Sequence, residues 1–281
     1  MDIEVRKMPV GVQNFEKLRR GGYVYVDKTR YVYELACLDR PYFLGRPRRF
    51  GKSVFLSTLK AYFEGKKELF DGLAIAELEK EWKKYPVIYI DFNREGYIDI
   101  NSLKSVLDYN LQQSEEIWGR NESEMATLST RFAGLIKRAA EKAHERVVVL
   151  IDEYDKALIS TLDNVALNDE MRTILKGFFG VLKAEDEHLR FVLLTGVTKF
   201  SKVSIFSDLN QLIDISFDSR YSGVCGISEA ELLQNFQPEI QVLGDANGLT
   251  YDEAFAAMKK RYDGYHFARE SEDMYNPYSV L

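Results

Sequence analysis

The stretch GRPRRFGKS, residues 45–53, ends in Gly51, Lys52 and Ser53 like a phosphate-binding loop. The usual pattern, G-x-x-x-x-G-K-[ST], requires a glycine at the position that Arg46 occupies. Arginine does not readily adopt the positive φ that is open to glycine, but Pro47 fixes its own φ near −65°, so the chain can enter the turn differently. We therefore interpret the stretch as a variant phosphate loop. The alternative is a chance G-K-S at the start of a helix.

The residues around this stretch match the elements that such a loop needs. The apolar run YFLG before it predicts a strand, and KSVFLSTLKAYFEG after it has Phe55, Leu59 and Phe63 at helical spacing, with Gly65 as a stop signal. A phosphate loop combines a strand, a tight turn and a helix whose positive end faces the phosphates. In that arrangement Lys52 would bind the β- and γ-phosphates, and the Ser53 hydroxyl would bind Mg²⁺.

A second motif supports the first. The run VVVLIDE, residues 147–153, predicts a buried strand that ends in Asp152, placed to hold Mg²⁺, and Glu153, placed to orient the attacking water. The alternative is a core strand that ends in two solvated carboxylates. The run FVLLTG ends near Thr195, a candidate sensor of the γ-phosphate, with Thr198 as the second choice. Either threonine could instead be an ordinary turn residue.

The distribution of apolar runs indicates the fold class. PYFLG (41–45), VIYIDF (87–92), VVVLID (147–152) and FVLLTG (191–196) read as strands covered on both faces, and helical patterns lie between them. This alternation predicts an α/β fold with a mainly parallel sheet. We expect an N-terminal segment over 1–40 packed on a core over 41–216. The capping box of Ser228 and Glu231 and the run 250–265 predict a small helical lid over 217–281.

Composition excludes several classes of protein. The chain has 281 residues, 46% of them apolar, and a net charge of −6, which argues against a surface that binds nucleic acid everywhere, although arginines 46, 48 and 49 form a local basic patch. Only Cys37 and Cys225 are present, so we expect reduced thiols. The start lacks a signal-peptide pattern, and no apolar run is long enough to span a membrane. We expect a cytoplasmic protein.

Taken together, the blocks resemble the AAA-ATPase-like proteins of bacteria and archaea. The blocks that carry the resemblance are MPVGVQNFEKLRRGGYVYVDKT (8–29), FLGRPRRFGKS (43–53), VVVLIDEYDKAL (147–158), TGVTKFSKVSIFSDLNQLIDIS (195–216), RYDGYHF and YNPYSVL. The resemblance implies a P-loop sheet with a strand inserted between the two motif strands, and it implies that the arginine in RPRRFGKS is shared by the family. Small departures are Ala157, where relatives often have proline, and Gln211, where asparagine is common. Such proteins often carry a C-terminal PD-(D/E)XK nuclease-like domain, and we expect the chain to be a fragment of a longer one.

The resulting hypothesis is an ATPase that uses ATP and Mg²⁺. Its expected catalytic residues are Glu153, Lys52 and Thr195, and its expected metal ligands are Ser53 and Asp152. The expected nucleotide contacts are Arg46, Pro47, Arg48, Arg49, Phe50, Gly51, Lys52, Ser53 and Val54.

Several points stay open at this stage. Arg220 and Arg261 are weak candidates for an arginine finger or a lid sensor. Arg48 and Arg49 would either neutralise phosphate charge or hold the loop through carboxylate pairs. The block YVYVDKT (23–29) would pack near the nucleotide or form an aromatic hairpin in which Asp27 pairs with an arginine of the loop. The competing functions are a nucleotide-binding switch that controls a nuclease-like partner, and a module that binds nucleic acid through RPRR. An oligomer is compatible with all three.

Overall fold

The computed structural model describes residues 6–197, 211–262 and 264–281. Its central element is a five-stranded, all-parallel sheet with the strand order β2-β3-β4-β1-β5. The strands are β1 (Pro41–Gly45), β2 (Val87–Asp91), β3 (Val147–Asp152), β4 (Leu189–Gly196) and β5 (Ile213–Asp214). The prediction of an α/β fold with a mainly parallel sheet is therefore confirmed for the described residues. Predicted and observed strand ends agree to within two residues.

The strand order separates the two motif strands. β4 lies between β1 and β3, so that Leu193 is in register with Tyr42 on one side and with Leu150 on the other. All six residues of β3 are buried, because a parallel strand in the middle of a sheet is covered on both faces. Parallel strands end at the same edge of the sheet, so the loop after β1 and the acidic end of β3 meet there.

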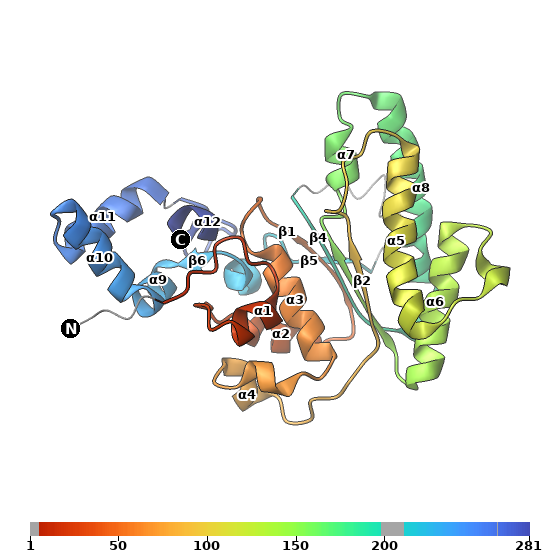
Figure 1. Ribbon diagram of the computed structural model, residues 1–281, viewed down its shortest axis with the longest axis horizontal. Helices are drawn as coiled ribbons and strands as arrows, with labels where there is room; N and C mark the ends of the chain where they lie inside the picture. Colours follow the sequence, from red (N-terminus) through yellow and green to blue (C-terminus); the bar gives the residue numbers. More distant parts are fainter. Residues whose placement is uncertain (1–5, 198–210, 263) are drawn as a thin grey trace.

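Helices cover both faces of the sheet (Figure 1). One face carries α1 (Phe15–Arg20), α2 (Thr29–Ala36), α3 (Lys52–Phe63) and α4 (Ala74–Leu78), and the other carries α5 (Ile100–Trp118), α6 (Leu128–Ala143), α7 (Lys156–Ser160) and α8 (Val165–Ala184). The alternation of side chains along β1 divides the core in two: Tyr42 and Leu44 pack towards α3, whereas Phe43 packs towards α5 and α8.

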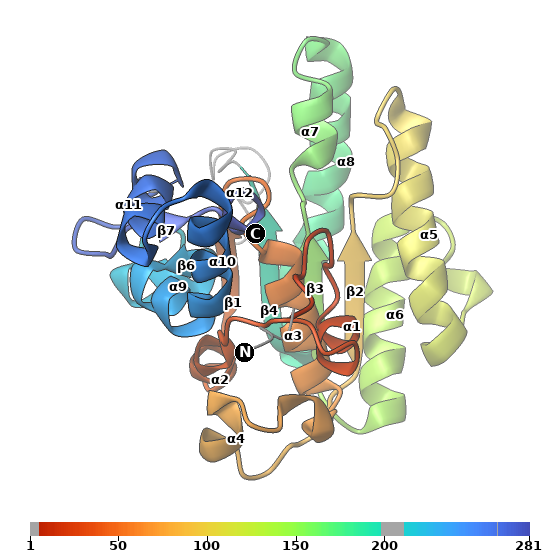
Figure 2. The ribbon, with the colours of Figure 1, turned by 60° about the vertical axis from the view of Figure 1, so that its left-hand side comes forward.

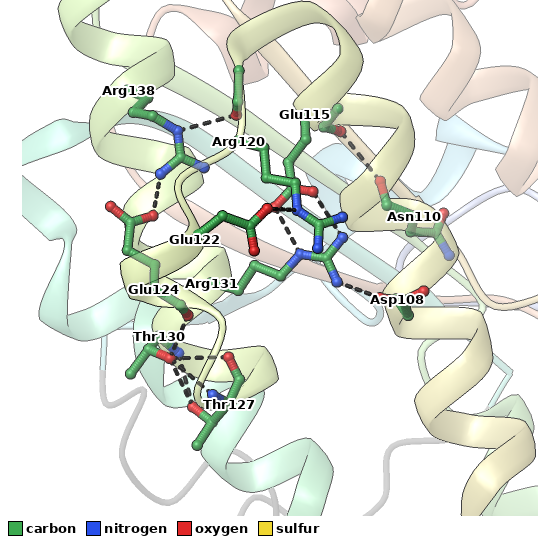
Figure 3. A network of polar contacts seen from close by, with 12 residues as sticks. Asp108, Asn110, Glu115, Arg120, Glu122, Glu124, Thr127, Thr130, Arg131 and Arg138 are labelled. Carbon is green, nitrogen blue, oxygen red and sulfur yellow. Dashed lines mark hydrogen bonds and ion pairs between the residues drawn. The ribbon is translucent and has the colours of Figure 1, made fainter.

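Helices α5 and α6 are joined by a buried ionic cluster (Figure 3). Arg131 of α6 is only 3% exposed and donates two hydrogen bonds of 2.7 Å to the carboxylate of Glu115 on α5. It also forms an ion pair with Asp108. The guanidinium is therefore bound by two carboxylates, one of them through both oxygens, which is the strongest geometry available to arginine.

The C-terminal residues form a smaller unit beside β1 and β5 (Figures 1 and 2). It contains β6 (Ile227–Ser228) paired antiparallel with β7 (Met274–Tyr275), and the helices α9 (Glu229–Asn235), α10 (Gln237–Asn247), α11 (Tyr251–Tyr262) and α12 (Pro277–Val280). The predicted capping box at the start of α9 is confirmed. Ile227, Leu232, Phe236 and Ile240 belong to a separate apolar core in this unit. That these residues act as a lid stays a prediction.

The described residues also form four short 3₁₀ helices. They are η1 (Lys67–Phe70), η2 (Glu122–Glu124), η3 (Asp186–His188) and η4 (Ser219–Val224). Among the helices of the described ranges, none combines the length and the apolar character that crossing a bilayer requires.

Candidate functional site

The loop between β1 and α3 has the backbone geometry of a ligand-binding turn. Gly51 has φ +95° and occupies the N-cap position of α3, and Arg49 has φ +66°. Positive φ is costly for arginine and natural for glycine, so the turn uses its glycine where the chain enters the helix. α3 has 12 residues, and the N–H groups of its first turn have no partner within the helix. Together with the helix dipole, they favour an anion at this end.

Arg46 is buried, and its side chain anchors the loop through hydrogen bonds to other segments of the chain. It is 1% exposed, and its guanidinium donates to the carbonyl oxygens of Ser216 at 2.6 Å and Tyr221 at 2.9 Å. Its own N–H donates to the carbonyl oxygen of Gly196 at 3.1 Å, and its guanidinium carbon lies 4.1 Å from the ring centre of Phe267. Burial lowers the pKa of Arg46. These contacts explain why an arginine can stand at this position, and the predicted nucleotide contact of Arg46 stays a prediction.

Lys52, the first residue of α3, lies within the curve of the loop. It is 3% exposed, and its Nζ donates to the carbonyl oxygens of Arg46 at 3.0 Å and Pro47 at 3.1 Å. The same Nζ lies 3.0 Å from Oε1 of Glu153. The structure thus brings together the lysine of the first motif and the glutamate of the second; the roles expected for them stay predictions.

Asp152 at the end of β3 accepts hydrogen bonds from two hydroxyls. Thr195 Oγ1 donates to its Oδ1 at 2.6 Å, and the Tyr89 hydroxyl donates to its Oδ2 at 3.4 Å. Burial raises the pKa of Asp152 above its ordinary value of 3.8, while the nearby hydroxyls of Ser53 and Thr195 oppose that rise. Ser53 and Asp152 are therefore neighbours, which is the arrangement expected for two ligands of one cation.

Glu153 has a backbone conformation that few non-glycine residues adopt. Its φ is +52°, and its N–H points towards Thr195 Oγ1 at 3.3 Å. Gly196 makes this turn possible, because a Cβ at that position would lie 2.6 Å from the ring of Tyr154. Strained residues concentrate at functional sites. The Thr195 hydroxyl is engaged with Asp152 and with the N–H of Glu153, so its contacts organise the acidic motif.

A cavity of about 450 Å³ lies in front of these groups. Loop residues 48–54 and Glu153 line one part of it. Other parts of the wall come from segments that are distant in sequence, among them residues 9–13, residues 24–26, Phe236, and Pro277 with Tyr278. A volume of this size is typical of small-molecule sites. The contributions of residues 9–13 and of the C-terminal residues could not be located from the motifs, whereas one interpretation of residues 23–29 placed them near the nucleotide.

Other predicted residues lie elsewhere. Arg220 bonds to Asp218 with its side chain 72% exposed, and Arg261 packs over the ring of Tyr262 on α11. Neither lines the cavity. Arg48 and Arg49 do line it, and Arg49 stacks 3.9 Å from the ring centre of Tyr278 without a carboxylate partner among the described residues. Thr198 and Asn210 fall outside the described residues.

The prediction that Asp27 pairs with a loop arginine is wrong. Its Oδ1 accepts hydrogen bonds from the N–H and hydroxyl of Thr29, and its Oδ2 accepts one from the N–H of Ala74. A carboxylate at these positions satisfies N–H groups at the starts of α2 and α4, which have no partner within their helices. The other interpretation of this block is closer to the structure, because Val24, Val26 and Lys28 line the cavity.

Comparison with known proteins gives the family. The family described as "Predicted AAA-ATPase" matches residues 9–206. A curated protein of Azotobacter chroococcum mcd 1, described as "Uncharacterized protein in vnfD 5'region", is 40% identical over 277 residues. The match covers 98% of this chain and 51% of the relative, so the chain spans about half the length of the curated relative it matches. Since the family match spans well over half of the sequence, this chain belongs to the predicted AAA-ATPase family.

Proposed function

We propose that this chain binds ATP together with Mg²⁺ in the cavity and hydrolyses the bond to the γ-phosphate. One observation carries the proposal: the loop that begins α3 and the acidic end of β3 line the same cavity, with Lys52 Nζ 3.0 Å from Glu153. A backbone turn with positive φ, a helix N-terminus and a buried lysine suit phosphates, and a carboxylate beside them suits water. The sheet then corresponds to a P-loop sandwich of the additional-strand type, with residues 217–281 as its lid.

Ser53 and Asp152 fit the ligand set of Mg²⁺. Both offer oxygen atoms, the Ser53 hydroxyl is near enough to Asp152 to lower the pKa of its carboxyl, and carboxylates and hydroxyls are the hard ligands that Mg²⁺ prefers. Mg²⁺ bound with a nucleotide usually takes only one or two protein side chains. This agrees with the lack, within the described ranges, of a cluster of three acidic, histidine or cysteine side chains. When bound, the ion supplies positive charge beside the β- and γ-phosphates.

Each residue of the site would have its own role in binding or hydrolysis. Lys52 exchanges its contacts with carbonyl oxygens and Glu153 for phosphate oxygens, and Glu153 becomes available to orient a water molecule. Thr195 holds Asp152 in place through its 2.6 Å hydrogen bond. The apolar part of the cavity would accept the base; it is lined by Pro9, Val10, Val12, Val24, Val26 and Phe236.

A second function is favoured by one contact. The ion pair between Lys52 and Glu153 occupies both groups that hydrolysis needs. A chain that keeps this pair for most of the time would bind nucleotide and turn over slowly, as a switch. Nucleic acid, a nuclease-like domain and a second copy of the chain are further proposed partners, and the chemistry of the cavity is the same with each of them.

Mg²⁺-dependent phosphate release from ATP tests the proposal. We expect Lys52→Ala to weaken ATP binding by about 2–5 kcal/mol, which is roughly 30- to 4,000-fold, because a buried charged partner of the phosphates is lost. Glu153→Gln should abolish turnover and bind ATP more tightly than the native chain, because it frees Lys52 and removes a negative charge beside the phosphates.

The matched control is Arg220→Ala, which removes an exposed cation that is remote from the cavity. It should leave binding and turnover unchanged. ATP binding without turnover in the native chain would favour the switch. No ATP binding at all would overturn both functions.

A further inference from the structure

The cavity contains more positive charge than the phosphate loop supplies. Its five cationic side chains are Lys28, Arg48, Arg49, Lys52 and Lys156. Lys28 is 8% exposed and donates to both carboxylate oxygens of Glu231 at 2.5 and 2.6 Å, so its charge is compensated. Lys52 has Glu153, Arg49 has the ring of Tyr278, and Arg48 is exposed on the loop itself. Lys156 belongs to a different element and has a different kind of partner.

Lys156 begins α7, three residues after Glu153. Its N–H donates to the carbonyl oxygen of Glu153 at 3.0 Å, which fixes its position relative to the proposed water-orienting carboxylate. Its Nζ donates at 2.9 Å to the amide oxygen of Asn93, a residue that follows β2 and also lines the cavity. An amide carries no net charge. Across the described parts of the chain, no carboxylate forms an ion pair with Lys156, so its positive charge is not compensated.

The surroundings of Lys156 hold its backbone in place. Ala157 and Leu158, the next two residues of α7, are fully buried in the core beneath α5 and α8. Asp155 accepts a hydrogen bond of 2.9 Å from the N–H of Val197. Figure 2 shows α7 beyond the end of the sheet towards which the β2 arrow points. The lysine thus has a rigid base and a flexible side chain that reaches the cavity.

We propose that Lys156 is a catalytic residue that contacts the γ-phosphate and stabilises the transition state from within the same chain. The inference rests on the proposed function. In the reaction, the oxygen of a water molecule bonds to the γ-phosphorus while the bond from that phosphorus to the bridging oxygen breaks. The products are ADP, inorganic phosphate and one proton. Negative charge is then spread over the transferring oxygens and the leaving oxygen, and a cation placed there lowers the barrier.

The positions of Arg220 and Arg261 support this assignment. Arg220 and Arg261, which the sequence offered as candidates for an arginine finger, do not line the cavity. Lys156 lines the cavity beside Glu153. The chain therefore has a candidate of its own for the positive charge that stabilises the transition state, which many such enzymes obtain from a partner. Asn93 would be the positioning residue that holds Nζ until nucleotide binds.

The test compares Lys156→Met and Lys156→Arg with Lys104→Met, a control at an exposed lysine of α5. An arginine finger contributes about 10³–10⁵ to kcat, and for a single ammonium group we expect Lys156→Met to lower kcat by about 100-fold or more. Lys156→Arg should recover part of the loss. ATP affinity should fall by roughly 10-fold, whereas ADP affinity should not change, because ADP lacks the γ-phosphate. Specific activity should not change on dilution.

Three results would overturn the inference while leaving the proposed function intact. These are native kcat in Lys156→Met, equal losses of ATP and ADP affinity, which would indicate a structural role, and specific activity that falls on dilution, which would indicate a residue from a second copy. If the native chain binds ATP without turnover, the catalytic role fails. The contact with the γ-phosphate is then tested by affinity alone: it holds if Lys156→Met weakens the binding of ATP but not that of ADP. If the native chain binds no ATP, the proposed function itself fails.

Discussion

Two of the places where the described residues bury positive charge differ in the partners of the cation. Between α5 and α6, Arg131 is bound by the carboxylates of Glu115 and Asp108 (Figure 3). At the loop between β1 and α3, Arg46 bonds to backbone carbonyl oxygens, whereas Lys52 bonds to two carbonyl oxygens and also pairs with Glu153. Carboxylates neutralise a cation, whereas carbonyl oxygens satisfy its N–H groups and leave its net charge. The first arrangement holds two helices together; in the second, the guanidinium of Arg46 is bound by carbonyl oxygens rather than by a carboxylate.

The largest expected effect comes from breaking the neutralised cluster. Arg131→Met leaves Glu115, which is 5% exposed, as a buried carboxylate without its partner. We expect a loss of about 3–5 kcal/mol in the free energy of unfolding, measured by urea denaturation, with ATP affinity unchanged. The double variant Arg131→Met with Glu115→Leu should recover most of the stability, because no isolated charge then remains. A loss below about 1 kcal/mol in the single variant would contradict this assignment.

A smaller effect is expected from Arg46→Met. This substitution removes the donors to the carbonyl oxygens of Ser216 and Tyr221, but it leaves no carboxylate without its hydrogen-bond donor. We therefore expect the free energy of unfolding to fall by about 1–3 kcal/mol. The loop should also loosen, and ATP should bind more weakly. Arg48→Met, at an exposed position of the same loop, is the matched control for stability. If Arg46→Met destabilised the chain as much as Arg131→Met, the distinction between the two clusters would not hold.

The smallest effect concerns pH. Because the pKa of Asp152 is raised in the folded chain, the folded chain holds that proton more tightly than the unfolded chain. The corresponding stability is present below the ordinary value of 3.8 and is lost as pH rises through the raised pKa. In Asp152→Asn, the stability measured by thermal unfolding should therefore fall less than in the native chain as pH rises from 3.8 through the raised pKa. Thr173→Ala, at an exposed position of α8, should keep the native profile; an Asp152→Asn profile parallel to the native one would refute the assignment.

Local patterns located four of the five strands of the sheet and several residues that line the cavity. The apolar runs located β1 and β3, and the helical spacing after Gly51 located α3, because burial on both faces and helical periodicity leave direct traces in sequence. The motifs also identified Lys52 and Glu153, which the fold brings to 3.0 Å. The partners of surface residues could not be predicted in this way. Asp27 caps helix starts, and Arg220 pairs with its near neighbour Asp218, since a charge alone does not specify which group it will meet.

The sequence by itself determined the alternation of strands and helices, the phosphate-loop pattern and the family, because each depends on the order and spacing of nearby residues. The tertiary structure alone decided the contents of the cavity. Segments 9–13, 24–26 and 277–278 meet around the loop, and Lys156 lies there with Asn93 as its partner. It also decided that Arg46 is an internal support, because its hydrogen-bond acceptors lie about 170 residues further along the chain. Contacts across such separations follow from packing of the whole chain, and no local pattern encodes them.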